Sequence, residues 1–188
     1  TLPTLFLPHL ALCYYPVFAF LLSSLPSPHA VHCDCPTHPM GCGASTLKYE
    51  SLATLRGHSS SVYAVACFAL ADGTPRAISG SSDKSLRVWD PLAGTCLATL
   101  TGHSSWVVAV ACFALADGTP RAISGSSSDE SLRVWGLAGT CLATLTGHSS
   151  WVVAVACFAL ADGTPRAISG SRDDSLRVWD PLAGTCLA

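Results

Sequence analysis

The sequence predicts an all-β protein built from three copies of one unit of four short strands. Histidine recurs at His58, His103 and His148, which are spaced 45 residues apart. Between these positions, short runs of β-branched and small residues alternate with turn residues, and no stretch has a helical period. In addition, 49% of the 188 residues are hydrophobic, so the chain can bury a core.

The repeated unit is nearly unchanged from copy to copy. Residues 102–126 recur without a change as residues 147–171. The copy at residues 57–81 differs at two positions, with Ser61 in place of Trp and Tyr63 in place of Val. Self-similarity at a period of this length is typical of architectures in which one supersecondary unit is stacked several times.

Turn residues set the limits of the strands in the first unit. Asp-Gly with Pro, Ser-Asp-Lys, and Asp-Pro with Gly separate the apolar runs, and these residues supply positive φ, a fixed φ or side-chain turn bonds. The run VYAVACFA is rich in small and β-branched residues, as expected for a strand crowded on both faces. The expected strands are Val62–Leu70, Arg76–Ser81, Ser85–Trp89 and Thr95–Leu100.

The unit, with Gly-His before its first strand and Trp-Asp at the end of its third, resembles the WD-repeat family of β-propellers. The resemblance covers residues 50–188 and implies three blades of four antiparallel strands, at about 57–101, 102–146 and 147–188, in an incomplete ring. The second unit has Gly136 where the family has Asp, together with an extra Ser in the 126–128 run, so we expect a slightly altered turn there. The matching motifs are Gly57-His58 with Trp89-Asp90, Gly102-His103 with Trp135, and Gly147-His148 with Trp179-Asp180.

The resemblance also implies a structural tetrad in each blade, in which His, Ser, Asp and the Trp indole are hydrogen-bonded to one another. Such a set suits buried polar groups, since each of them needs a partner. By motif matching, the tetrads are His58, Ser79, Asp83 and Trp89; His103, Ser124, Asp129 and Trp135; and His148, Ser169, Asp173 and Trp179.

Ser, His and Asp together also suggest a catalytic triad. Against this, the set recurs in every unit, the G-x-S-x-G elbow is absent from the sequence, and the Trp gives the Ser a structural partner. The sequence contains no P-loop or HExxH motif either. We therefore expect a noncatalytic protein without a cofactor.

Charge argues against nucleic acid as a partner. The chain carries 10 basic and 12 acidic residues, a formal net charge of −2, and only 12% of its residues are charged. Two repeated arginine sets are interpreted as solvated strand positions or interblade ion pairs, because nearby Asp and Glu neutralise them. They are Arg76, Arg121 and Arg166, and Arg87, Arg133 and Arg177.

Residues 1–47 differ from the rest, since they hold one charge, Asp34, and seven of the twelve prolines. The apolar run at residues 10–22 is too short for a membrane helix and contains Pro16, so no membrane partner is expected. A disordered segment, an artefact of the gene model and a targeting segment remain as interpretations. Weak candidate zinc ligands lie in the same segment at His32, Cys33, Cys35, His38 and Cys42, in one crowded run without two separated pairs.

Six cysteines recur within the repeats. The first and fourth strands of a blade are separated by about 14 Å, too far for the bridged Cα atoms, which lie within about 7 Å of each other. We interpret these residues as small buried thiols of a reducing compartment, the cytoplasm or alternatively the nucleus, rather than of a secreted protein. They are Cys67, Cys112 and Cys157 in first strands and Cys96, Cys141 and Cys186 in fourth strands.

The number of blades is low, because propellers close with about four to eight. Residues 51–55 copy the fourth strand of a unit, and the last copy stops in the middle of that strand, at Ala188. In the family such an N-terminal strand completes the last blade. We therefore expect either a fragment of a longer propeller or a half-ring that associates with a second copy, since open strand edges otherwise promote aggregation.

Function in the resembled family lies mainly on the rim, so peptides or protein domains are the expected partners. The leading hypothesis is a noncatalytic scaffold for protein–protein interaction. The alternatives are a structural array at the sensor or regulatory end of a larger protein, and a zinc-stabilised or membrane-targeted protein that depends on residues 1–47. The candidate partner-binding residues are Trp106 and Trp151 with Ser61 in the matching place, and Ser82, Ser128 and Arg172. For the two tryptophans, packing against the neighbouring blade is the alternative interpretation.

Overall fold

The computed structural model describes residues 53–188, which belong to one unit, Tyr49–Ala188. These residues form twelve strands and no helix, in three sheets of four antiparallel strands each. Within each sheet the strands pair in chain order. The blades are β1 (Val62–Ala69), β2 (Pro75–Ser81), β3 (Ser85–Asp90) and β4 (Thr95–Thr101); β5 (Val107–Ala114), β6 (Pro120–Ser126), β7 (Leu132–Gly136) and β8 (Cys141–Leu145); and β9 (Val152–Ala159), β10 (Pro165–Ser171), β11 (Leu176–Asp180) and β12 (Thr185–Cys186).

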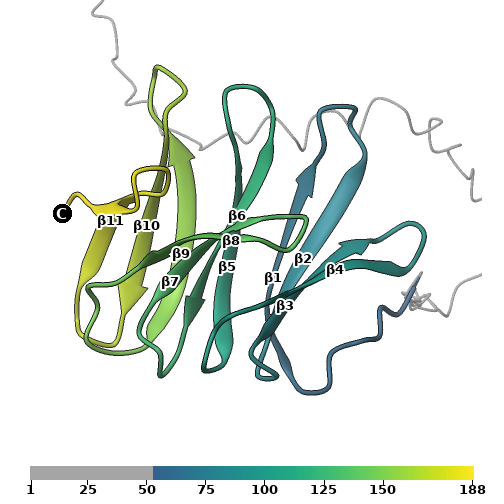
Figure 1. Cartoon of the computed structure of the whole chain (residues 1–188), viewed down its shortest axis with the longest axis horizontal. Coiled ribbons are helices and arrows are strands. Elements are labelled where there is room, and N and C mark those ends of the chain that lie inside the picture. The colour runs from purple at the N-terminus through teal and green to yellow at the C-terminus, as the bar shows by residue number, and fades with distance from the viewer. Residues whose placement is uncertain (1–52) are drawn as a thin grey trace, which may run out of the picture. The chain divides into compact units, whose positions relative to one another are not determined.

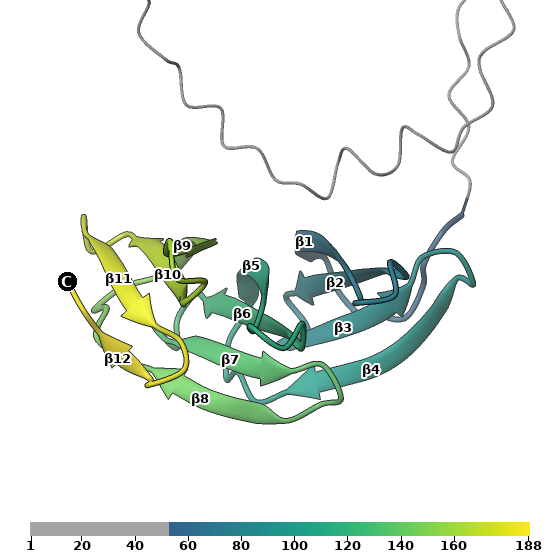
Figure 2. The same ribbon diagram turned by 90° about the horizontal axis from the view of Figure 1, so that it is seen from above.

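The three sheets stand side by side as propeller blades (Figure 1), and they form an open arc. Seen from above, the first strands β1, β5 and β9 lie along the inner side of the arc, and β4, β8 and β12 lie along its outer side (Figure 2). The expected all-β architecture of four-stranded propeller blades in an incomplete ring is confirmed.

Local chemistry explains where the strands end. After β1, the Asp72 carboxylate accepts a hydrogen bond from the backbone N–H of Thr74 at 2.9 Å, and Gly73 has φ 82°. After β2, Lys84 adopts φ 69°, with Glu130 and Asp174 in the same place of the other blades. A non-glycine residue in the left-handed region is uncommon and marks a turn whose geometry the surrounding hydrogen bonds hold in place.

The hydrophobic core lies between the blades. One face of each blade packs against the inner strands of the next, because each sheet is apolar on both sides. At the first junction, Ile78 and Leu86 of blade 1 are buried with Val107 and Trp135 of blade 2. At the second junction, the corresponding cluster is Ile123, Leu132, Val134, Leu145, Val152, Cys157, Ala167 and Trp179.

A close backbone approach fixes the spacing of the blades. A Cβ added to Gly80 would lie 2.7 Å from Val107 Cγ1, and one added to Gly125 would lie at the same distance from Val152 Cγ1. Only glycine leaves room for these valines without a shift of the neighbouring blade.

Blade 2 has an altered turn after β7, as the Gly136 substitution predicts. In blade 1 the Asp90 carboxylate accepts hydrogen bonds from the N–H groups of Leu92 and Ala93, and it forms an ion pair with Arg76 at 3.1 Å. Gly136 supplies no carboxylate, and its N–H instead donates to the carbonyl of Thr140. The blade is nevertheless intact.

The outer strand expected at residues 51–55 is not formed over residues 53–55, whereas residues 51 and 52 lie outside the described part. A strand needs a partner along its edge, and in this open arc the residues are not paired with the last blade. The strand therefore stays a prediction for a closed ring.

Candidate functional site

The tetrad of blade 1 is a directional chain of hydrogen bonds that joins β2 and β3 to the turn between them and to the segment before β1. The Trp89 indole N–H donates to Ser79 Oγ at 2.8 Å, and Ser79 Oγ lies 2.7 Å from His58 Nε2. His58 Nδ1 lies 2.8 Å from Asp83 Oδ2. Because a carboxylate only accepts, Nδ1 carries the donated proton, and in a neutral imidazole Nε2 then accepts from the Ser79 hydroxyl. A neutral imidazole thus satisfies every member.

The same chain recurs in the other two blades with nearly the same geometry. The indole-to-hydroxyl distance is 2.8 Å in both, and the His Nδ1 to carboxylate distances are 2.6 and 2.7 Å. The histidines are buried in blades 2 and 3. The structure thus brings together all four members that the motif assigns to each blade: His103, Ser124, Asp129 and Trp135, and His148, Ser169, Asp173 and Trp179.

Each tetrad Asp has further partners that the motif did not assign. Burial alone would raise the pKa of the Asp83 carboxyl, but hydrogen bonds from Ser85, His58 and the Ser59 backbone hold that pKa well below its usual range. Ser131 and Ser175 occupy the place of Ser85. The signal for this fifth member was present as an Asp-x-Ser spacing around the left-handed turn residue.

The connectivity of Ser, His and Asp matches that of a catalytic triad. The Ser Oγ, however, accepts the indole N–H of the Trp and is buried in all three blades. A hydroxyl held between an indole and an imidazole is suited to tying a blade together, since in blade 1 the Ser lies on β2, the Trp on β3 and the His in the segment before β1.

The two Trp residues that follow the Gly-His motif, together with the side chains that contact their rings, form a surface that we call the aromatic rim. It consists of Tyr63, Trp106, Trp151 and Arg172. Trp106 of blade 2 stacks on Tyr63 of blade 1, with ring centroids 5.7 Å apart and planes at 19°. Trp106 is nevertheless 43% exposed and Tyr63 51% exposed. In blade 3 the Arg172 guanidinium lies over the Trp151 ring, 4.2 Å from its centroid.

The serine candidates Ser61 and Ser82 form hydrogen bonds with nearby residues of their own blade. Ser61 is exposed, and its carbonyl accepts from the N–H of Ser82 at 2.9 Å. The Ser82 hydroxyl donates to Ser60 Oγ, and Ser128 is exposed. Tyr63 was missed as a candidate, although its replacement of the Val found in the other copies was a signal.

The cysteines differ from the expectation of buried thiols. Of the six in the described residues, Cys157 is the only buried one, Cys112 is half-buried, and the other four are free and exposed. The fourth strand lies at the outer edge of each blade, so its cysteines face solvent. Burial raises the pKa of the Cys112 thiol to about 12.

Metal-binding clusters of His, Cys, Asp or Glu are absent from residues 53–188. The weak zinc candidates His32, Cys33, Cys35, His38 and Cys42 lie outside the described residues.

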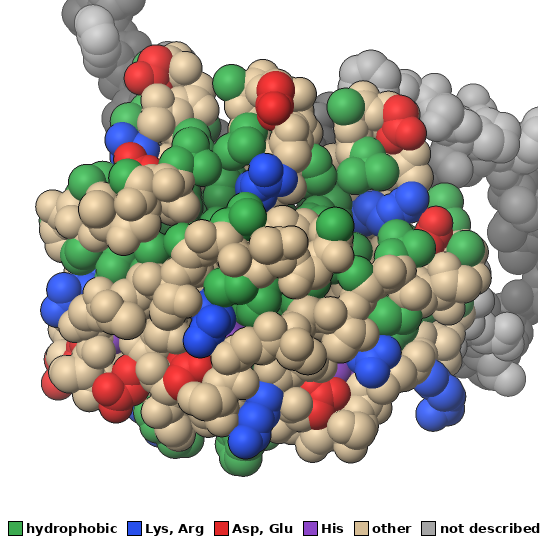
Figure 3. All heavy atoms as spheres, viewed as in Figure 1, with side chains coloured by type: hydrophobic (Ala, Val, Ile, Leu, Met, Phe, Trp, Pro, Cys, Tyr) green, Lys and Arg blue, Asp and Glu red, His purple; other side chains and the backbone are tan. Residues whose placement is uncertain are grey.

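Five of the six repeated arginines contact a carboxylate or a sulfur atom, the exception being Arg121. The ion pairs lie within single blades, so the interpretation as interblade pairs is wrong. Arg76 and Arg166 form ion pairs with Asp90 and Asp180, both at 3.1 Å. Arg87 Nη1 donates to Cys96 Sγ at 3.6 Å, and Arg133 and Arg177 have matching contacts. On the face shown in Figure 3, basic and acidic side chains are dispersed among one another.

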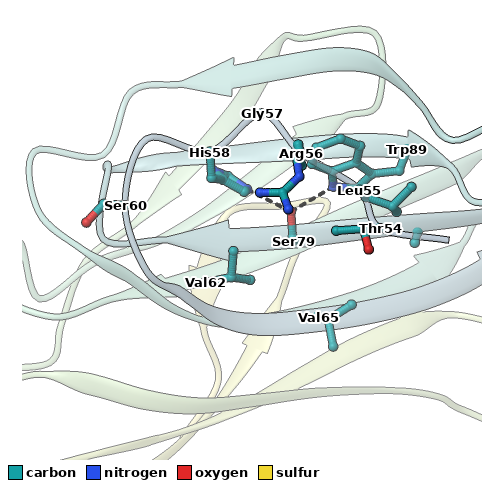
Figure 4. Close-up of a pocket in the computed structure, with 11 residues that line it drawn as sticks. Thr54, Leu55, Arg56, Gly57, His58, Ser60, Val62, Val65, Ser79 and Trp89 are labelled. Atoms are coloured by element: carbon teal, nitrogen blue, oxygen red, sulfur yellow. Dashed lines mark hydrogen bonds between the residues drawn. The ribbon is translucent and has the colours of Figure 1, made fainter. Parts of the chain in front are cut away.

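A cavity opens on the side of blade 1 that faces away from blade 2. Its volume is about 340 Å³, and it is lined by Leu55, Val62, Val65, Ala77 and Trp89 together with the tetrad residues His58 and Ser79. Figure 4 shows Ser79 hydrogen-bonded to His58 and Trp89 among the lining residues, with Val62 and Val65 projecting from β1.

No helix of the described residues is long and apolar enough to cross a membrane.

Comparison with known proteins places the features of the three blades in a family. A search of curated proteins gives no match. The family model for the WD domain, G-beta repeat, matches residues 49–90, 94–136 and 139–180, one match for each blade. These matches cover more than half of the chain. Each contains one tetrad and the three inner strands of one blade, while the outer strands β4 and β8 fall at the start of the next match. The chain belongs to the WD40 repeat family.

Proposed function

We propose that this protein is a noncatalytic scaffold that binds a peptide or protein segment on its aromatic rim. WD40 repeats generally mediate protein–protein interactions, and WD40 domains are typically noncatalytic. The observation that carries the proposal is the pair Tyr63 and Trp106, two rings from different blades that stack while about half of each stays exposed. Large aromatic side chains of this kind are enriched among interface residues that dominate binding.

The chemistry of the rim indicates the kind of segment. Two nearly parallel rings offer a flat apolar edge, which suits an aliphatic, aromatic or proline side chain of the partner. Arg172, exposed over the Trp151 ring in the next blade, adds a cation at the far end of the same rim. A segment with an apolar anchor and an acidic residue would match both.

A peptide-display selection on the purified chain tests the proposal, with affinity measured on the selected peptides. Trp106→Ser introduces the residue that blade 1 has at this position, and Tyr63→Val introduces the residue of blades 2 and 3, so both changes have a precedent in the chain. We expect Trp106→Ser to weaken binding by about tenfold or more. Leu92→Ser, at an exposed turn position outside the rim, is the matched control. Unchanged affinity in both rim variants would refute the proposal.

The alternative of a structural array at the sensor or regulatory end of a larger protein is favoured by the near-identity of the repeats, residues 102–126 and 147–171. In that case blade number rather than any rim residue sets the activity. Deleting one unit would then lower the activity of the larger protein more than either rim substitution does. The four exposed free thiols, Cys67, Cys96, Cys141 and Cys186, support a reducing compartment, the cytoplasm or nucleus.

A further inference from the structure

The two ends of the arc expose faces that are buried at both internal junctions. Val62 is 53% exposed on blade 1, whereas its counterparts Val107 and Val152 are fully buried against the preceding blade. On blade 3, Leu176 is 70% exposed, whereas its counterparts Leu86 and Leu132 are fully buried against the following blade. The free faces therefore carry the two halves of one junction.

We propose that two copies of this chain associate head to tail, with the free face of blade 1 of each copy packed on the free face of blade 3 of the other. Six blades would then close one ring, within the range of about four to eight that propellers use. The proposal is independent of the rim, because it concerns the sides of the end blades.

The sequence identity of the repeats supports a second copy of this chain as the partner of the free faces. At the first junction, Ile78, Leu86 and Val88 of one blade are buried with Val107, Ala122 and Trp135 of the next. The free faces offer the same residue types at the same positions. They are Ile168, Leu176 and Val178 on blade 3, and Val62, Ala77 and Trp89 on blade 1. Ala77 and Trp89 are already buried within the single chain, whereas Val62 and Leu176 are exposed.

The close approach between a glycine of one blade and a valine of the next has no counterpart at Gly170 within the single chain. Gly80 and Gly125 each hold a valine of the next blade near the position of a Cβ. A Cβ on Gly170 would meet its own blade's Leu176 and Ala154, and no residue of another blade. Val62 of a second copy, which lines the cavity of blade 1, has the side chain that fits this place.

The outer strand edge of blade 3 is a third feature that supports the head-to-tail dimer. In blade 1, β3 pairs with β4 at Leu86–Leu100 and Arg87–Thr99. In blade 3, β11 pairs with β12 at Trp179 and Asp180, and the backbone of Val178 is hydrogen-bonded to Leu187 and Ala188. Leu176 and Arg177 have no paired strand residue opposite them in the described chain. Thr54 and Leu55 repeat the residues Thr99 and Leu100. In the proposed ring they add to this edge in the partner copy, and Leu55 closes the cavity of its own blade 1.

The first test is the mass of the full chain in solution by size-exclusion chromatography with light scattering. We expect twice the 19.5 kDa of one chain. Val62→Arg and Leu176→Arg place a charge in the proposed junction and are each expected to weaken the dimer by about tenfold or more. Leu92→Arg adds the same charge at a position that is 81% exposed, in the turn after β3, and should leave the mass unchanged. A folded monomer at high concentration, or open polymers of growing mass, would overturn the proposal.

Cross-linking tests the pairing of the two faces directly. The added Cβ of Gly80 lies 3.2 Å from Val107 Cβ, close to the roughly 3.5–4.5 Å between the Cβ atoms of a disulfide. Val62→Cys and Gly170→Cys should therefore form a disulfide between copies. We expect oxidation to give a covalent dimer above the wild-type background in a mixture of the two variants, and not in either variant alone. No added cross-link in the mixture, or equal cross-linking of one variant alone, would contradict head-to-tail pairing.

Discussion

Blades 2 and 3 contain the same sequence over residues 102–126 and 147–171, yet the structure buries that sequence differently. Ile123 is fully buried, while Ile168 in the same place is only partly buried. The following strands share the contrast, with Leu132 buried and Leu176 mostly exposed. Burial of a propeller face is thus a property of the next blade rather than of the residues themselves.

The polar tetrads behave in the opposite way. The hydrogen bonds of blade 3 have nearly the lengths of those in blade 2, although blade 3 lacks a following neighbour. Their partners all come from one blade, so neighbours are not needed to position them. Each blade therefore combines an internal polar network with apolar faces that depend on association.

The largest expected difference between the two blades comes from shortening the same leucine. Leu132→Ala removes a fully buried side chain and should lower the free energy of unfolding by about 2–5 kcal/mol. Leu176→Ala at the exposed counterpart should change it by less than about 0.5 kcal/mol in the isolated chain. Urea denaturation at a concentration where the mass is that of one chain measures both. Equal losses would show that the two faces are equally covered.

Removing the tetrad hydroxyl should have an intermediate effect that is the same in both blades. Ser124→Ala and Ser169→Ala each leave an indole N–H and an imidazole nitrogen without their partner, at a cost of about 1–3 kcal/mol. Because both networks are internal to a blade, the two losses should agree within about 0.5 kcal/mol. A much smaller loss in blade 3 would mean that its tetrad depends on a neighbour.

The tetrad carboxylates predict a loss of stability in acid. Burial opposes ionisation of Asp129, but hydrogen bonds from His103 and Ser131 keep its pKa well below the ordinary value of about 3.9. A lowered pKa in the folded state stabilises the fold above that ordinary value, and the contribution is lost as the pH falls below it. We expect unfolding midpoints to decrease from about pH 5 downward. Asp129→Asn should be less stable at pH 7 and should lose less between pH 7 and 4, and an unchanged slope would contradict the assignment.

The smallest expected effect concerns the turn that distinguishes blade 2. Gly136→Asp would supply the carboxylate that Asp90 and Asp180 provide in the other blades, and would offer Arg121 an ion-pair partner. Because such pairs are partly exposed, the gain should be about 0–1 kcal/mol. Thermal unfolding of the variant beside the wild type measures it, and a clear loss of stability would show that the turn of blade 2 requires glycine.

The repeat period and the turn residues were sufficient to predict the strands. The strand expected at Val62–Leu70 is Val62–Ala69 in the structure, because Asp72 and Gly73 fix its end by local chemistry. The members of the tetrads could be assigned from the family resemblance, since the motif places each one at a fixed position relative to the strands.

Features that depend on packing between blades could not be predicted in this way. The stacking of Tyr63 on Trp106 requires the spacing of two sheets, which no local pattern encodes. Thiol burial was predicted wrongly for the fourth strands, because an apolar composition does not tell an outer edge from an inner strand. The extra partner Ser85 was missed although its spacing from Asp83 is regular.

The tetrads also give each blade its own spectroscopic reporter. Trp89, Trp135 and Trp179 have buried indole N–H groups bonded to serine, whereas Trp106 and Trp151 lie on the rim and complete the five tryptophans of the chain. In deuterium oxide, each buried indole proton exchanges only when its own blade opens. Three resolved exchange rates would therefore show whether the arc opens one blade at a time from its ends or as a single cooperative unit.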